Sequence, residues 1–263
     1  MYRANHLGFL PFQAACGIIS KTKPTPSSAL TRNEISMKKT AFSLASKQIT
    51  LYEQPDPSVI FFQPVDDHDE ASLDNQVAYM EQHTDQTFAL CAAKINQWGQ
   101  ELSPWKAPAV FGKDDFGDGA GDTLDFLADM LIPELKANYQ LGEGAKKILG
   151  GYSLAGLFAL WCGYQTDLFS GIAAASPSVW FPGWIDYAKE HSFHPRNAYL
   201  SLGNKEARTR NPVMATVADC IQEQHEIFRS VGVDAVLEWN QGNHFQDADI
   251  RTAKGFLHFL KTS

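Results

Sequence analysis

The chain has 263 residues, of which 44% are hydrophobic, and a formal net charge of −8 at pH 7. This length and this apolar fraction suit one large domain with a full core. The acidic balance, without a cluster of Lys and Arg, argues against nucleic acid as a partner. No apolar run approaches the roughly 18 residues that a membrane span requires, so we expect no membrane partner either.

The first residues differ from the remainder of the chain. Residues 1–36 include a polar Lys21–Ser28 stretch that cannot pack well, and Met37 begins a segment that resembles a translation start. Residues 42–47 lack the apolar core of about seven residues that a signal peptide needs, so we expect no export. We therefore predict a disordered or non-core extension over 1–36 and a single domain over 37–263.

From residue 48 onward, strand-like and helix-like patterns alternate. This alternation predicts βαβ units and an α/β fold, with a mostly parallel central sheet and helices on both faces. Pro133 is expected to kink the helix that contains it. The predicted strands cover residues 48–53, 58–65, 88–95, 147–151, 171–176, 197–202 and 235–240. The predicted helices cover 73–83, 123–139, 184–191, 213–231 and 247–260, and an apolar segment of helical length begins at 156.

The stretch from Lys146 to Trp161 has the pattern of a nucleophile elbow. A short apolar strand ends in glycine, Ser153 stands at a tight corner, and an apolar helix follows. The positions two before and two after the serine tolerate only small side chains, and here they hold Gly151 and Ala155. The helix would aim the amide of Leu154 at a developing oxyanion. An ordinary Gly/Ser-rich turn is the alternative.

A serine needs a base to take its proton and an acid to orient that base. In parallel sheets such groups follow the carboxyl ends of strands. His244 follows the last predicted strand and Glu206 the strand before it, in the chain order that α/β-hydrolases use. The alternatives are a solvated loop histidine and a surface Glu paired with Lys205.

Further residues are expected around this centre. The second oxyanion donor should come from the turn after strand 58–65, and since Pro64 has no amide we expect it to be Val65. Four aromatic residues on loops beyond strand ends are expected to line an apolar acyl pocket, Trp98, Trp105, Trp180 and Phe181, and Tyr152 is expected to bind substrate. Core or surface aromatics are the alternative.

Cofactor and metal sites are not expected. The glycines of residues 117–121 lack the Lys and Ser/Thr of a phosphate loop. His191 and His194 lie in a connector without nearby acids and read as surface residues. Cys16, Cys91, Cys162 and Cys220 are widely spaced, which is typical of free thiols in a reducing, cytoplasmic compartment.

Two segments resemble a known family. Gly151–Leu160 (GYSLAGLFAL) and Ala175–Trp180 (ASPSVW) resemble the putative-esterase (esterase D-like) family of α/β-hydrolases, and within it the siderophore esterases that hydrolyse enterobactin and salmochelin. The resemblance covers about residues 48–260. It implies an α/β-hydrolase fold, with Ser153 as nucleophile, His244 as base and Glu206 in support.

The chain departs from this family pattern in three places. Ala155 replaces a glycine, Gln63-Pro64 replaces Asp-Gly, and the loop over 96–105 lacks an arginine that would suit an anionic or catecholate substrate. We therefore expect a serine esterase that cleaves small acyl esters or thioesters through an acyl-enzyme, without a cofactor. The alternatives are a catalytically silent scaffold that binds a ligand or partner, and an acyltransferase that uses the same residues.

Overall fold

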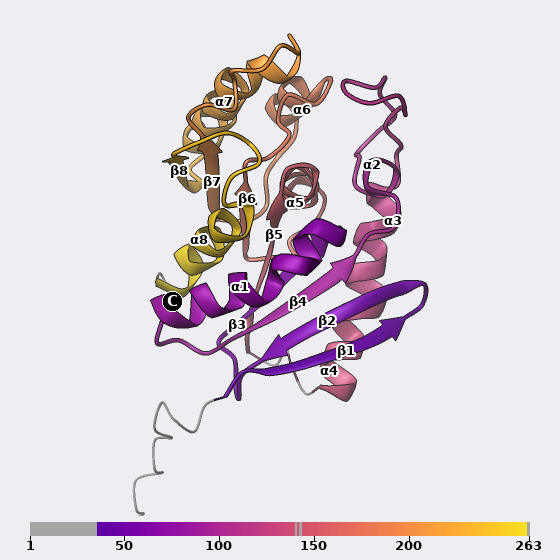
Figure 1. Ribbon diagram of the computed structural model, residues 1–263, viewed down its shortest axis with the longest axis vertical. Coiled ribbons are helices and arrows are strands. Elements are labelled where there is room, and N and C mark those ends of the chain that lie inside the picture. Colours follow the sequence, from indigo (N-terminus) through magenta and orange to yellow (C-terminus); the bar gives the residue numbers. More distant parts are fainter. Residues whose placement is uncertain (1–35, 140, 142–143, 262–263) are drawn as a thin grey trace, which may run out of the picture. The chain divides into compact units, whose positions relative to one another are not determined.

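The structure is a computed structural model that describes residues 36–139, 141 and 144–261. The predicted extension over 1–36 lies outside the described residues, apart from Ser36. Eight strands form one sheet in the order β1-β2-β4-β3-β5-β6-β7-β8 (Figure 1). The pairs β1–β2 and β2–β4 are antiparallel, and the five remaining pairs are parallel. The strands are β1 Lys38–Leu44, β2 Lys47–Glu53, β3 Val59–Val65, β4 Phe88–Lys94, β5 Lys146–Tyr152, β6 Gly171–Ala175, β7 Asn197–Gly203 and β8 Asp234–Asn240.

Helices cover both faces of the sheet, as the alternating pattern predicted. The structure thus has the α/β-hydrolase architecture. None of the helices within the described residues is both long enough and apolar enough to span a bilayer. The helices are α1 Asp67–His83, α2 Trp98–Glu101, α3 Ala120–Asp125, η1 Phe126–Leu131, α4 Ile132–Asn138, α5 Leu154–Gln165, α6 Trp184–Glu190, η2 Met214–Thr216, α7 Val217–Ser230 and α8 Ala248–Lys261.

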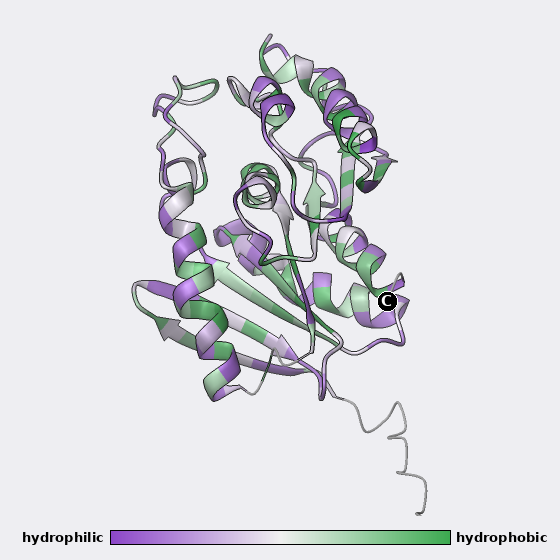
Figure 2. Cartoon of the chain, turned by 180° about the vertical axis from the view of Figure 1, so that it is seen from behind, coloured by the Kyte–Doolittle hydropathy of each residue, from purple (hydrophilic) through white to green (hydrophobic). Residues whose placement is uncertain are grey.

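The core consists of two layers, one on each face of the sheet. Strand β3 buries all seven of its residues, with Ile60 and Phe62 on one face and Val59 and Phe61 on the other. The first face packs against the helices from α3 to α7, while the second packs against α1 and α8. In Figure 2 the central strands are mostly green, whereas the outer helices carry both colours. Burial on both faces explains why the central strands read as continuous apolar runs.

Strand β1 was not predicted. It forms the edge of the sheet, and all of its residues are exposed or only half-buried. An edge strand with solvent on most of its side chains has a weak hydrophobic pattern. Its contribution is a hairpin with β2, closed by Ala45 at φ 53°, and a stacking contact between Phe42 and Tyr139 at 5.0 Å.

A kink was predicted at Pro133. In the structure, residues 126–131, just before this proline, form a π-helix that leads into α4. Pro133 has no N–H to give to the preceding turn, and a π-turn is one way in which a helix accommodates a missing bond. The single helix predicted over 123–139 is therefore three consecutive segments, α3, η1 and α4.

We propose that residues 37–263 form the folding unit. A chain that begins at Met37 retains the whole described sheet, so its melting temperature should stay within about 3 °C of the full chain, a shift that corresponds to less than about 1 kcal/mol. Calorimetry of the two purified proteins measures this. The matched control is a chain that begins at Lys47, which lacks β1 and should melt well below both. Equal losses in the two truncated chains would contradict the assignment.

Candidate active site

Ser153 stands between the end of β5 and the start of α5, in a backbone conformation that L-residues rarely adopt. Its φ is 57° and its ψ is −119°. Three backbone hydrogen bonds hold this conformation. The Ser153 amide donates to the Ala175 carbonyl at 3.1 Å, and the Ser153 carbonyl accepts from the Ser178 amide at 3.0 Å and from the Leu157 amide at 3.1 Å. The turn therefore presents the Ser153 hydroxyl beyond the carboxyl end of the sheet, as a nucleophile elbow does.

The small residues around Ser153 are required by close contacts. A Cβ added to Gly151 would lie 2.6 Å from the Cβ of Ala155, and one added to Gly156 would lie 3.1 Å from the Gly151 carbonyl oxygen. One methyl group therefore fits between positions 151 and 155, but two do not. This explains how the turn accepts Ala155 where the related pattern has glycine: Gly151 leaves the space.

Three side chains from the ends of β5, β7 and β8 form a hydrogen-bonded chain. The Nε2 atom of His244 lies 3.0 Å from the hydroxyl oxygen of Ser153, and its Nδ1 lies 2.7 Å from Oε2 of Glu206. The Ser153 hydroxyl also lies 3.3 Å from that of Ser178. The structure thus brings together the serine, the histidine and the acid that were singled out from the sequence.

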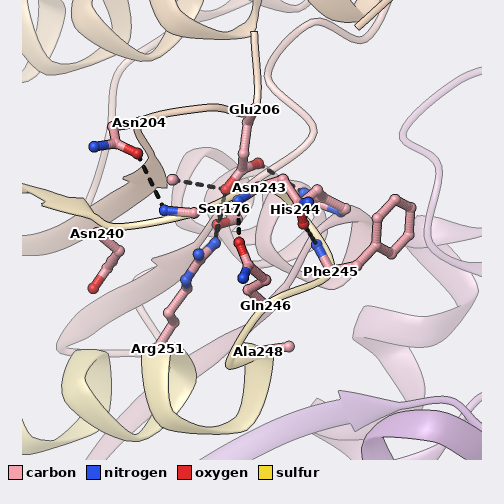
Figure 3. Close-up of polar contacts among 12 residues, drawn as sticks. Ser176, Asn204, Glu206, Asn240, Asn243, His244, Phe245, Gln246, Ala248 and Arg251 are labelled. Carbon is pink, nitrogen blue, oxygen red and sulfur yellow. Dashed lines mark hydrogen bonds and ion pairs between the residues drawn. The ribbon is translucent and has the colours of Figure 1, made fainter. Parts of the chain in front are cut away.

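Glu206 is almost fully enclosed, and each of its carboxylate oxygens has partners (Figure 3). Its Oε1 atom accepts hydrogen bonds from the Gly203 amide at 2.7 Å and the Ser176 hydroxyl at 2.7 Å, and pairs with Nη1 of Arg251 at 3.0 Å. Burial alone would raise the pKa of this carboxyl, but hydrogen bonds from His244, Ser176 and Gly203 outweigh that effect and lower the pKa below its ordinary value. Glu206 is therefore an anion at neutral pH.

Arg251, on the first turns of α8, was not singled out from the sequence. Its side chain is 2% exposed. Besides Glu206 it donates to the Gln241 carbonyl at 2.8 Å and to the Tyr152 hydroxyl at 3.2 Å, and that hydroxyl donates in turn to the His244 carbonyl at 2.7 Å. Arg251 therefore links the acid to the loop that carries the histidine. An arginine amid the apolar residues of this last helix was the available signal.

A cavity of about 410 Å³ opens beside Ser153 and His244. Of the aromatic residues expected to line a pocket, three do so: Trp98, Tyr152 and Trp180. Trp105 and Phe181 do not. Phe181 is buried in the core, the Trp105 ring packs against Phe181 and Trp184, and the Trp105 indole N–H donates to the Pro182 carbonyl at 3.0 Å. The complete lining is Asp66, His68, Asp69, Trp98, Phe111, Tyr152, Ser153, Trp180, Met214, His244, Phe245 and Ala248.

The expected second oxyanion donor, Val65, is not oriented toward the serine. The Val65 carbonyl accepts a hydrogen bond from the Ile95 amide at 2.9 Å, just beyond the end of β4. Within an extended strand, the N–H and C=O of one residue point toward the same neighbouring strand, so the Val65 amide also faces β4. Strand β5, which leads to Ser153, lies on the other side of β3. The next residue, Asp66, is also extended, and successive amides of an extended backbone point to opposite sides.

The fold and this hydrogen-bonded chain define an α/β-hydrolase with a serine, a histidine and an acid at the carboxyl ends of its strands. The model of the family described as "Putative esterase" matches residues 70–232, which is more than half of the chain. The chain belongs to this family, and it is a carboxylic ester hydrolase. No curated protein matches the sequence significantly.

Solved structures share the fold. The siderophore hydrolase EstA from Aspergillus nidulans is 16% identical, with a TM-score of 0.69, and the match covers 92% of this chain and 100% of that one. An IroE-like serine hydrolase from Shewanella oneidensis is 16% identical, with a TM-score of 0.70 over 86% of this chain and 80% of that one. The enterobactin esterase FES from Shigella flexneri is 14% identical, with a TM-score of 0.63 over 87% and 60%.

The space shared by positions 151 and 155 leads to a double-mutant test. Gly151→Ala should lower the free energy of unfolding by about 1–3 kcal/mol, because its methyl group would overlap that of Ala155. Adding Ala155→Gly should recover part of the loss, since it vacates the contested space. Urea unfolding of the two single variants and the double variant gives the coupling energy. Strictly additive losses would show that the two positions do not compete.

The ion pair beneath Glu206 also leads to a test. Arg251→Met should lower the free energy of unfolding at pH 7 by about 3–5 kcal/mol, because it leaves a buried carboxylate without its cation. The lowered pKa of Glu206 contributes stability above the ordinary pKa of a glutamate, and this contribution is lost as pH falls through the folded-state value. The deficit of the variant should therefore shrink near pH 4.

The matched control is Lys254→Met on the same helix. Lys254 forms an ion pair with Glu238 in which both side chains are more than a third exposed. Exposed pairs contribute at most about 1 kcal/mol, so this variant should differ little from the wild-type protein. If Arg251→Met were as mild as this control, or if its deficit were the same at pH 4 and pH 7, the account of the buried pair would be wrong.

Proposed function

We propose that the protein hydrolyses carboxylic esters or thioesters of small acyl groups through an acyl-enzyme formed on Ser153. One observation carries this proposal: the contacts from Ser153 Oγ to His244 Nε2 at 3.0 Å and from His244 Nδ1 to Glu206 Oε2 at 2.7 Å. These distances suit a nucleophile, a general base and an orienting acid.

The steps follow from these contacts. His244 Nε2 takes the proton from the Ser153 hydroxyl while the oxygen attacks the ester carbonyl, which gives a tetrahedral oxyanion. The oxyanion collapses, the bond to the alcohol or thiol breaks, and the imidazolium of His244 gives its proton to that leaving group. A water molecule, deprotonated by His244 in the same way, then attacks the acyl-enzyme and releases the acid. Ser153 recovers its proton and the cycle closes.

Glu206 supports His244 in two ways. Its carboxylate accepts the Nδ1 proton and so keeps Nε2 free to act as a base, and its negative charge stabilises the imidazolium that forms. The second carboxylate oxygen is held by Gly203, Ser176 and Arg251, which prevents the acid from turning away. The proposed role therefore depends on the buried partners of Glu206 as well as on Glu206 itself.

For the oxyanion, we assign the amides of Leu154 and Asp66. Leu154 is the first residue of α5, where backbone N–H groups have no partner within the helix. The Asp66 amide is favoured over the amide of Val65, since Val65 faces β4. The Asp69 carboxyl also accepts a hydrogen bond from the Asp66 backbone. In this assignment Asp69 turns away from that amide when the tetrahedral intermediate forms.

The cavity favours a small acyl substrate. Its volume is about 410 Å³, and Trp98, Trp180 and Phe111 supply much of its wall. Two structural neighbours are described as a siderophore hydrolase and an enterobactin esterase. The loop over residues 96–105 contains no arginine, and the cavity lining contains no Lys or Arg, so a strongly anionic substrate would meet no cation there.

We also propose a cytoplasmic location. Cys91, Cys162 and Cys220 carry free thiols in this structure, and the first two are buried. Burial raises the pKa of Cys162 well above its ordinary value, so this thiol stays protonated and inert. Free thiols of this kind are typical of reducing compartments.

The nucleophile assignment is tested by a fluorophosphonate probe together with turnover of p-nitrophenyl acetate. Ser153→Ala should abolish labelling and turnover, because no other group in the cavity is placed to form the acyl-enzyme. The free energy of unfolding should change by less than about 1 kcal/mol, since one oxygen atom is removed at an open site. His244→Ala should come close to the same loss of turnover. Glu206→Ala should be milder, on the order of tenfold to a thousandfold, because the acid only orients and polarises the base.

Peptide mass spectrometry locates the label. Ser178→Ala is the matched control, because its hydroxyl lies 3.3 Å from that of Ser153 without a contact to His244, and it should keep most of the activity. Labelling at Ser176 or Ser178 would move the active centre. A folded protein that neither labels nor turns over ester would favour the silent-scaffold alternative.

A further inference from the structure

The cavity beside Ser153 has an uneven distribution of charge. Its lining includes two carboxyl groups, Asp66 and Asp69, and two histidines, but no Lys or Arg. Both carboxyl groups come from the start of α1, which follows directly on β3. A substrate that enters this cavity therefore meets acidic groups on the side formed by α1.

The acids at the start of α1 do not all have the same partners. Asp67 and Glu70 form ion pairs with Lys94 at 2.6 and 3.0 Å. Asp66 caps the helix, and its Oδ1 accepts from the amides of His68 and Asp69 at 2.8 Å each. Asp69 remains: among the residues that the structure describes, no Lys or Arg forms an ion pair with its carboxyl group.

The electrostatic surroundings of Asp69 disfavour its charge. Burial raises the pKa of the Asp69 carboxyl to about 7, and the nearby Asp66 and Asp249 add to this effect. The hydrogen bond from the Asp66 backbone and the proximity of His244 act in the opposite direction. A carboxylate in such a position gains more from a bound cation than an exposed one does, because water stabilises it less.

Several aromatic rings also line the same cavity. Trp98, Phe111, Trp180 and Phe245 line it, and the Phe111 and Trp180 rings meet edge to face with centroids 6.0 Å apart. Phe245, which follows His244 directly, is 88% exposed, and in Figure 3 its ring points away from the loop that carries both residues. Ring faces attract ammonium groups, and the attraction grows when the cation is removed from water.

From the carboxyl group and the rings together, we propose that this cavity selects esters that carry an ammonium group a few atoms from the scissile carbonyl. Asp69 binds the cation, and the aromatic walls surround its alkyl groups. This inference rests on the proposed function, since the carbonyl must lie at Ser153. A cation that draws the Asp69 carboxylate into the cavity also frees the Asp66 amide for the oxyanion. The preference for cationic esters should therefore raise kcat as well as lower KM.

The test compares esters that differ only in charge. Acetylcholine and 3,3-dimethylbutyl acetate form one pair, in which a carbon atom replaces the quaternary nitrogen of the alcohol part. The p-nitrophenyl esters of 4-(trimethylammonio)butanoate and 5,5-dimethylhexanoate form a second pair, in which the same replacement is made in the acyl group. The measured quantity is the ratio of kcat/KM for the cationic ester to that for its neutral counterpart. At pH 8 we expect a ratio of at least about tenfold in one pair.

The variant Asp69→Asn should bring that ratio close to one. Because the ratio is taken within one protein, a general loss of activity in the variant cancels. Asp67→Asn is the matched control, since it makes the same change in the same turn of α1 outside the cavity, and it should keep the wild-type ratio. In the wild-type protein the ratio should also rise from pH 6 to pH 8 as Asp69 ionises, whereas in Asp69→Asn it should stay flat.

The outcomes separate this inference from the proposed function. Turnover of the neutral esters with a ratio near one in both pairs would overturn the cation preference and leave the esterase intact. A preference that survived in Asp69→Asn would remove Asp69 from the account. If none of the four esters were turned over and the fluorophosphonate probe did not label Ser153, the proposed function would fail and the preference with it.

Discussion

The active centre depends on a backbone turn that is unfavourable by itself. A non-glycine residue with φ 57° and ψ −119° costs about 1–3 kcal/mol, and it persists only where its surroundings fix it. Strand β6 supplies the acceptor for the Ser153 amide, and the segment after β6 supplies one of the two donors to its carbonyl. The strain at Ser153 is thus maintained by the parallel pairing of β5 and β6, which the whole core stabilises.

The segment over residues 176–180 shows how closely this turn is supported. The Ser176 hydroxyl donates to Glu206, the Ser178 amide holds the Ser153 carbonyl, and the Trp180 ring lines the cavity. Each of these contacts comes from a different residue of one short loop. A motif of the form Ser-Pro-Ser-x-Trp is therefore informative because its members act on three separate parts of the same centre.

The sequence was sufficient to predict which side chains meet beside Ser153, but not which way the backbone amides and aromatic rings around them point. Ser153, Glu206 and His244 could be predicted because side chains that follow parallel strands must meet at one edge of the sheet. Successive backbone amides of a strand point to opposite sides, and the sequence does not show which of them face the serine. This is why Val65 was expected where we propose Asp66. Nothing in the sequence separates Trp105, whose indole donates to the Pro182 carbonyl outside the cavity, from Trp98 and Trp180.

Arg251 and strand β1 were missed for different reasons. The pattern of β1 is weak because an edge strand is mostly exposed, so its hydrophobic alternation was not recognised. Arg251 lies among buried residues of α8, and a buried charge is rare enough to have been a signal. Its partner could not be predicted, because the contact joins residues 45 positions apart through the packing of a helix against two loops.

The fold gives the two acids near His244, Glu206 and Asp69, opposite shifts in pKa. Glu206 pairs with the buried Arg251, and hydrogen bonds from His244, Ser176 and Gly203 lower its pKa. Asp69 forms no ion pair with a Lys or Arg of the described residues, and burial raises its pKa to about 7. An anion that must stay charged to orient His244 needs a permanent partner from the protein. An anion whose charge depends on what enters the cavity is suited to recognise a ligand, because the missing cation can come from the substrate.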